Sequence, residues 1–166
     1  VDPVNCAIVL PDENLLVPVL NSIPESVSDI NVTMGLPMTG STLYSMMADI
    51  SAVQLHTLNR NGKWHFYHKQ VWDLFSNDLF RKASDQDTRD IVAKVKSETK
   101  YYIPQEDLSG TLLLDTVFRP VVTDAKSNDA GQIAAFAEYQ KNIITTIAPA
   151  VIDDTRLALE LEYAKE

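Results

Sequence analysis

The sequence predicts a mostly α-helical fold with a small N-terminal α/β portion. Two observations lead to this prediction. The longest strand-like runs lie before residue 35, where one continuous apolar run and one alternating β-branched run occur. From Ser41 onward, apolar residues mostly recur at the three- and four-residue spacing of amphipathic helices. This change of pattern predicts two parts, residues 1–40 as the edge of an α/β domain and residues 41–166 as a helical accessory domain.

The N-terminal part has the residue pattern of a strand–helix–strand unit. Cys6–Leu10 is a continuous apolar run, which is typical of a buried strand. Leu15–Leu20 is predicted to be a helix capped by Asp12 or Asn14. Ile30–Met34 alternates and is rich in β-branched residues, so a second strand is expected there. This order is typical of a parallel α/β sheet.

Residues 41–100 are predicted to contain three helices and one extended segment. The first helix is capped by Ser41 or Thr42 and buries one broad apolar face. A strong turn is expected at Asn59–Gly62, because Asn and Gly accept left-handed backbone angles. After it come an extended segment at Trp64–Tyr67, a helix at His68–Asn77, and a helix capped within Ser84–Asp87 that ends near Lys100.

The last third of the chain is predicted to be helical after one interruption. Tyr101–Pro104 must leave helical geometry, because the residue before a proline is pushed towards extended backbone. Leu112–Val122 fits either a buried helix or a strand, and helix is favoured. A clear helix follows at Ile133–Ile147 and is ended by Pro149. Another is expected to start at Asp153, where the helix dipole favours negative charge.

Composition narrows the classes of function. The chain has 14 basic and 23 acidic residues, a formal net charge of −9, which opposes phosphate backbones and disfavours a stand-alone DNA-binding domain. Its single cysteine excludes a disulfide framework and a multi-cysteine zinc site, and favours the reducing cytoplasm. No apolar run approaches the ~20 residues that span a bilayer, so no membrane partner is expected.

A local basic and aromatic segment is the exception to this acidity. The segment contains Arg60, Lys63, His65, His68 and Lys69. Six aromatic residues are interleaved with these charges or follow them: Trp64, Phe66, Tyr67, Trp72, Phe75 and Phe80. They fit either stacking with single-stranded bases or packing against one another, and packing is the commoner explanation. The candidate DNA contacts are Arg60, Lys63, Trp64 and Lys69.

One segment approaches a phosphate-binding loop. Gly35–Thr42 has two glycines at the required spacing and ends in threonine, between a predicted strand and a predicted helix. However, Ser41 stands where a lysine should reach the phosphates, and Pro37 removes one amide donor. The sequence therefore predicts no nucleotide-binding residue here, and a helix cap at Ser41 instead.

No catalytic residue and no metal site are predicted. His65 and His68 have no third histidine or cysteine nearby, whereas zinc needs three or four ligands. Asp12 and Glu13 are the one acidic pair at the carboxyl end of a predicted parallel strand, where α/β sheets bind ligands. This pair leaves open the alternative of a small independent hydrolase.

The order of segments resembles a known family. The segment Ala7-Ile8-Val9-Leu10-Pro11-Asp12-Glu13-Asn14-Leu15-Leu16 is followed by Pro18-Val19-Leu20-Asn21-Ser22-Ile23-Pro24, then Ile30-Asn31-Val32-Thr33-Met34-Gly35-Leu36-Pro37 and a helical region. This resembles the AddB/RexB-like subunits of bacterial helicase–nucleases, relatives of UvrD-type superfamily 1 helicases. The resemblance is strongest over residues 6–40, and the Trp64–Phe75 segment supports it.

The resemblance implies a function for the parent protein. Residues 1–40 would be the edge of the second RecA-like domain, and residues 41–166 its helical 2B-type insertion. The parent would act in double-strand break repair with an ATP-driven motor, Mg²⁺, a PD-(D/E)XK nuclease domain and a helicase–nuclease partner subunit. Active motors of this family carry a basic nucleotide-contacting residue after the strand that matches Ala7–Leu10. Here Pro11-Asp12-Glu13 follows instead, which resembles subunits that have lost motor activity.

The predicted role is therefore non-catalytic. The chain starts at Val1 without an initiator methionine and stops within a helical pattern, so we expect it to be an internal, C-terminally truncated piece of a longer protein. It would need no cofactor of its own and would position DNA or the partner subunit. The main alternative is a helical protein–protein interaction module without DNA affinity, which the net acidity favours.

Overall fold

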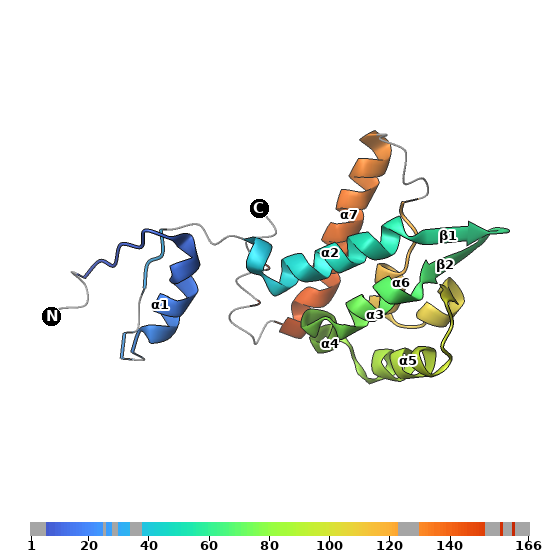
Figure 1. Cartoon of the computed structure of the whole chain (residues 1–166), viewed down its shortest axis with the longest axis horizontal. Coiled ribbons are helices and arrows are strands. Elements are labelled where there is room, and N and C mark those ends of the chain that lie inside the picture. Colours follow the sequence, from blue (N-terminus) through green and yellow to red (C-terminus); the bar gives the residue numbers. More distant parts are fainter. Residues whose placement is uncertain are drawn as a thin grey trace. The chain divides into compact units, whose positions relative to one another are not determined.

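The computed structural model describes residues 6–24, 26–27, 30–33, 38–122, 130–151, 157 and 161. The chain divides into two compact units, Val1–Gly40 (unit 1) and Ser41–Glu166 (unit 2), which are described separately (Figure 1). The described residues are mostly helical, with one small antiparallel sheet. This confirms the predicted fold class, mostly α-helical with a small α/β portion, although the sheet lies within residues 57–104 and not at the N-terminus where it was expected.

Unit 1 contains one short α-helix among its described residues. Asp12 accepts a hydrogen bond from the backbone N–H of Asn14 at 3.0 Å and so caps the 3₁₀ turn η2 (Glu13–Leu15). The turn leads into α1 (Leu16–Ser22). The predicted helix is thus confirmed, but Asp12 caps the 3₁₀ turn that precedes it, and α1 itself begins after Leu15 without a side-chain cap. A second 3₁₀ turn, η3 (Met38–Gly40), ends the unit.

The two predicted N-terminal strands differ from the structure. Residues 6–10 and 30–33 are not paired in any sheet, and residue 34 lies outside the described residues. The side chain of Val9 is 88% exposed and that of Ile8 is 62% exposed. A strand is stable only when neighbouring strands take its backbone hydrogen bonds and a core covers its apolar face. The composition of these two runs therefore favours strands, but neither run forms one.

Unit 2 is built mainly from helices. They are α2 (Thr42–Leu55), α3 (His68–Ser76), α4 (Asp78–Ala83), α5 (Gln86–Ser97), α6 (Leu112–Val117) and α7 (Ala130–Ile147), with the 3₁₀ turns η4 (Gln105–Leu108) and η5 (Ala148–Val151). Side chains at four N-caps accept a backbone N–H, namely Ser41, Asn77, Asp85 and Thr111. No helix in the described part of the chain combines the length and apolarity needed to cross a bilayer.

The sheet of unit 2 has three antiparallel strands. They are β1 (Thr57–Arg60), β2 (Lys63–Tyr67) and β3 (Tyr102–Pro104), with β2 in the centre. In Figure 1, α2 leads directly into the β1–β2 hairpin. Phe66 of β2 pairs with Ile103 of β3, and both side chains are fully buried. Side chains alternate along a strand, so the opposite face carries their neighbours.

An aromatic group forms the centre of the core beneath the sheet. Phe66 and Phe75 both contact the ring of Phe118, with ring centroids 5.2 and 5.9 Å apart in edge-to-face geometry. Phe80 lies 5.3 Å from Phe75. All four rings are at most 3% exposed. Phe66, Phe75 and Phe80 thus confirm the packing explanation for half of the predicted aromatic set.

A buried glutamine joins α2, α7 and the non-helical segment that follows α6. The Nε2 amide of Gln54 in α2 donates to the carbonyl of Arg119 at 2.9 Å and to the hydroxyl of Tyr139 in α7 at 3.0 Å. Its Oε1 accepts the backbone N–H of Val121 at 3.0 Å. The Tyr139 hydroxyl donates in turn to the carbonyl of Val117. Burial raises the pKa of Tyr139, so the hydroxyl stays protonated and remains a donor.

Candidate nucleic-acid interface

The β1–β2 hairpin presents two cations at its tip. Asn61 and Gly62 form the two-residue turn with φ angles of 53° and 82°. Both angles are left-handed, which matches a type I′ turn and explains the Asn-Gly sequence. The Asn59 side chain accepts the Gly62 N–H at 3.0 Å and closes the turn. The predicted turn is confirmed, and it places Arg60 directly opposite Lys63 in the register.

The outer face of the sheet carries a cation on an aromatic ring. Tyr67 pairs with Tyr102 in the register, so both side chains lie on the face opposite the buried Phe66. The guanidinium carbon of Arg60 lies 5.0 Å from the centroid of the Tyr102 ring. This is cation–π geometry, and the Arg60 side chain is exposed.

Further rings extend this face beyond the ends of β2 and β3. The Tyr101 side chain is 66% exposed, and its ring centroid lies 5.4 Å from that of Tyr67 and 4.6 Å from that of His68. The Nδ1 atom of His68 is 3.0 Å from the carbonyl oxygen of Tyr101. We call Arg60, Tyr67, His68, Tyr101 and Tyr102 the aromatic face.

One tyrosine of this face is hydrogen-bonded to another. The hydroxyl of Tyr67 donates to that of Tyr101 at 3.4 Å. This hydrogen bond raises the pKa of Tyr67 above its ordinary value. The phenol therefore stays protonated at neutral pH and adds no negative charge to a surface that would meet phosphates.

Trp64 lies beside a separate hollow next to the hairpin turn. It is half-buried, as are Tyr67 and Trp72. The hollow has a volume of about 310 Å³ and is lined by Gly62, Lys63, Trp64, Pro104, Gln105, Glu106 and Ser109. Lys63 forms an exposed ion pair with Glu106 at 3.6 Å. Exposed pairs of this kind contribute little free energy and exchange readily with other partners.

Of the four predicted DNA contacts, Lys69 lies away from the other three. It is exposed in the first turn of α3. Within the described residues, no hydrogen bond, ion pair or ring contact joins it to Arg60, Lys63 or Trp64. The structure thus brings Arg60 and Lys63 together at one hairpin tip, with Trp64 beside them, and places Lys69 at the far end of β2.

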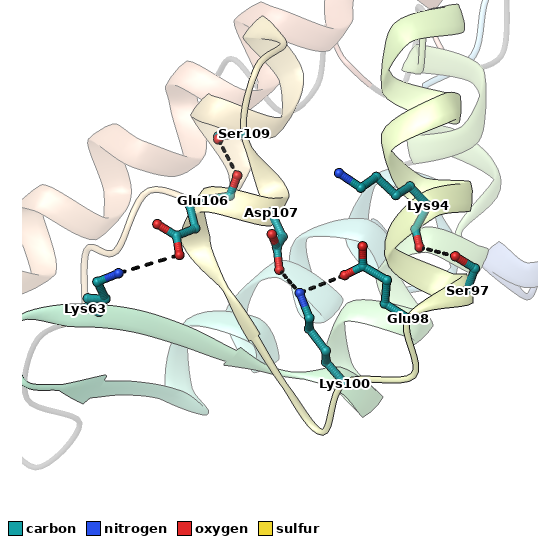
Figure 2. Close-up of polar contacts among 8 residues, drawn as sticks. All are labelled: Lys63, Lys94, Ser97, Glu98, Lys100, Glu106, Asp107 and Ser109. Atoms are coloured by element: carbon teal, nitrogen blue, oxygen red, sulfur yellow. Dashed lines mark hydrogen bonds and ion pairs between the residues drawn. The ribbon is translucent and has the colours of Figure 1, made fainter.

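An ion-pair group fixes the segment that precedes Tyr101. Figure 2 shows Lys100 reaching between two carboxylates, with its Nζ atom 2.6 Å from Asp107 and 2.7 Å from Glu98. The hydrogen bond to Asp107, followed by that to Glu98, raises the pKa of Lys100. Lys100 therefore ties the end of α5 to η4, and β3 runs between these two segments.

Sequence reasoning missed Tyr101 and Tyr102. They were predicted only to leave helical geometry ahead of Pro104, and the structure makes Tyr102–Pro104 an edge strand. The available signal was the order aromatic, aromatic, isoleucine, proline, because β-branched and aromatic residues favour strands and proline is confined to edges. The partner strand lies more than thirty residues earlier, so local pattern alone could not pair them.

The other sequence candidates show no reacting geometry among the described residues. Asp12 accepts both the backbone and the side-chain N–H groups of Asn14, and the strand expected to precede it is not formed. The structural basis for placing Asp12 and Glu13 at a sheet edge is therefore wrong. Ser41 accepts the Tyr44 N–H at 3.0 Å as the cap of α2. Residues 34–37 of the glycine loop lie outside the described residues.

Comparison of the chain with protein-family models, with characterised proteins and with solved structures finds no match.

Proposed function

We propose that this chain is a non-catalytic part of an ATP-dependent helicase–exonuclease subunit, and that it holds single-stranded DNA on its aromatic face. The parent protein would act in double-strand break repair in the bacterial cytoplasm, together with a partner subunit. The observation that carries the DNA-binding part is the Arg60 guanidinium 5.0 Å from the Tyr102 ring on the outer face of the sheet. The parent identity rests on the order of segments in residues 6–40.

The aromatic face has the two components that single strands require. Tyr101 offers an exposed ring on which a base can stack, and stacking contributes about 1–3 kcal/mol per base in other proteins. The half-buried Tyr102 ring carries the Arg60 guanidinium, which a base would have to displace or stack upon. Arg60 and Lys63 offer cations at one end of these rings for the phosphate backbone. A three-stranded sheet with one buried and one accessible face is a rigid support for such contacts.

The net charge of −9 is expected to weaken the affinity of this surface for DNA. The field of the whole chain repels a polyanion, so affinity would come mainly from stacking. Arg60, Lys63 and Lys69 could neutralise two or three phosphates. Since each phosphate contact on a single strand changes the slope of log K against log salt by about −0.7, a slope of roughly −1.4 to −2.1 is expected.

ATP and Mg²⁺ belong, under this proposal, to other parts of the parent protein. The position in Gly35–Thr42 that would need a lysine is Ser41, and its hydroxyl oxygen is used by the backbone of α2. The chain's own residues would therefore bind and orient the strand and carry out no bond cleavage.

The test is fluorescence anisotropy with a fluorescein-labelled oligothymidylate and the 166-residue chain. Binding is expected to weaken at least about tenfold in Tyr102→Ala, the equivalent of one lost stacking contact. The matched control is Tyr44→Ala, because Tyr44 is 50% exposed on α2, away from the sheet. Arg60→Glu should also weaken binding, with Lys141→Glu on α7 as its charge-matched control.

Two results would contradict the proposal. Absence of oligothymidylate binding at low salt would favour the protein-interaction module. Equal losses in Tyr102→Ala and Tyr44→Ala would show that the aromatic face is not the site. Folding of each variant is checked by circular dichroism before binding is compared.

A further inference from the structure

A second hollow of unit 2 is a groove between α4 and α5, distinct from the aromatic face. It has a volume of about 860 Å³. Its charged lining consists of four cations and one carboxylate, namely Arg81, Lys82, Arg89, Lys96 and Asp78. The groove is therefore strongly positive in a chain whose net charge is −9. Such a local reversal of sign is the electrostatic property that selects an anionic partner.

The cations lie on two helices that face each other across the groove. Arg81 is in the last turn of α4, and Arg89 and Lys96 are seven residues apart on α5, which places them on one side of that helix. The ion pair between Arg81 and Asp78 spans 3.5 Å, and its side chains are 69% and 79% exposed. An exposed pair of this kind costs little to exchange for a carboxylate of a partner.

The floor of the groove is apolar and aliphatic where it is accessible. Val92 and Ala93 of α5 line it, whereas the rings of Phe75 and Phe80 beneath are only 3% and 1% exposed. Buried rings cannot stack on bases, so the groove lacks the feature that makes the aromatic face suited to single strands. Leu157, from the C-terminal part of the chain, already lies against this floor and is 5% exposed. Leu157 is therefore part of the apolar lining, and the accessible aliphatic surface left for a partner is that of Val92 and Ala93.

We propose that the α4–α5 groove binds an acidic protein segment that anchors aliphatic side chains on the floor and places carboxylates against Arg81, Arg89 and Lys96. Charge complementarity selects the acidic chemistry, and the aliphatic floor selects leucine-like anchors. This surface is independent of the aromatic face, so the chain would hold DNA and a protein segment on different elements.

The test uses a fluorescein-labelled synthetic peptide of glutamate residues with leucine at every fourth position. Anisotropy is expected to report binding to the 166-residue chain, and the double variant Arg89→Glu with Lys96→Glu should weaken it at least about tenfold. The matched control is Lys94→Glu, an exposed cation on the same helix that does not line the groove. The same peptide with glutamine in place of glutamate should bind at least about tenfold more weakly.

Several outcomes would overturn the proposal. They are no peptide binding at low salt, equal binding of the glutamine peptide, or equal effects of the groove variant and Lys94→Glu. Loss of oligothymidylate binding in the groove variant, without peptide binding, would assign the groove to nucleic acid instead. The neutral pair Arg89→Gln with Lys96→Gln serves as a second variant if charge reversal alters the circular dichroism spectrum.

Discussion

Arg60 and Tyr102 are 42 residues apart in the sequence, yet the guanidinium carbon of one lies 5.0 Å from the ring centroid of the other. They come from the two edge strands of the sheet, with β2 between them. The Arg60 side chain therefore extends across the outer face of the sheet. Under the proposed function, this contact would also arrange a cation and a ring for single-stranded DNA.

The free energy of this contact can be measured with a double-mutant cycle. The variants are Arg60→Ala, Tyr102→Leu and the double variant, and urea unfolding gives the free energy of unfolding of each. An exposed cation–π pair predicts a coupling of about 0.5–1 kcal/mol. A coupling near zero would mean that the two side chains do not interact in solution.

Replacing Gly62 of the hairpin turn with alanine is expected to lower the stability of the protein. The Gly62 φ of 82° is strained for any residue with a Cβ, although no atom lies within 4 Å of where that Cβ would be. Gly62→Ala should lower the free energy of unfolding by roughly 1 kcal/mol. Gly40→Ala is the control, because Gly40 has the same open space without a left-handed φ. Equal effects in urea unfolding would contradict this explanation.

Lys100 is expected to position the aromatic face without contacting a ligand. Lys100→Met removes both ion pairs and leaves Asp107 and Glu98 facing each other without a cation. The melting temperature should fall, and oligothymidylate binding should weaken less than in Tyr102→Ala. Lys94→Met on α5 provides the control for loss of charge alone. Unchanged binding combined with a lower melting temperature would restrict Lys100 to a purely structural role.

Gln54 is expected to be the most sensitive polar residue of unit 2. Gln54→Leu removes the partner of the Val121 N–H and of the Arg119 carbonyl, in a part of the structure where Gln54 itself is only 1% exposed. The expected loss is about 2–4 kcal/mol of unfolding free energy. Gln140→Leu should change it by less than about 0.5 kcal/mol, since Gln140 makes one long contact of 3.5 Å with Ser51. Similar losses in the two variants would disprove the role of the network.

The cap of α5 predicts a pH dependence of stability with a definite sign. Hydrogen bonds from Thr88 lower the pKa of the Asp85 carboxyl below its ordinary value of 3.8. The stabilisation is therefore fully present above pH 3.8 and is lost as pH falls through the lower folded-state pKa. Asp85→Asn keeps an oxygen acceptor but removes the titration. The stability difference between the native chain and this variant should shrink below pH 3.8 in thermal unfolding. A stability difference that grows on acidification would contradict this prediction.

Caps and turns could be predicted from neighbouring residues, whereas the pairing of the strands into a sheet could not. Ser41, Asp85 and the Asn61–Gly62 turn each satisfy backbone groups within three residues, so their roles could be identified from the sequence. Tyr102 becomes a strand residue only because β2 lies beside it. Conversely, Cys6–Leu10 has a strand-like composition but no paired neighbour.

The same distinction between local and distant contacts applies to the candidate site. Arg60, Lys63 and Trp64 could be selected because they cluster in sequence around one turn. The Arg60–Tyr102 contact and the α4–α5 groove could not, since each depends on how distant segments pack. Arg81 stands beside Lys82 in the sequence and Arg89 follows eight residues after Arg81, but only the placement of α4 against α5 makes them two sides of one groove.

The Gln54–Tyr139 network has a consequence for how proteins of this fold can diverge. Glutamate at position 54 would have no amide to donate to the Arg119 carbonyl, and asparagine is one methylene too short to span the same distances. The Tyr139 hydroxyl bridges Gln54 and the Val117 carbonyl. Without Tyr139, Gln54 would keep its hydrogen bonds to the Arg119 carbonyl and the Val121 N–H. Glutamine is therefore expected to be retained at position 54 even where position 139 changes.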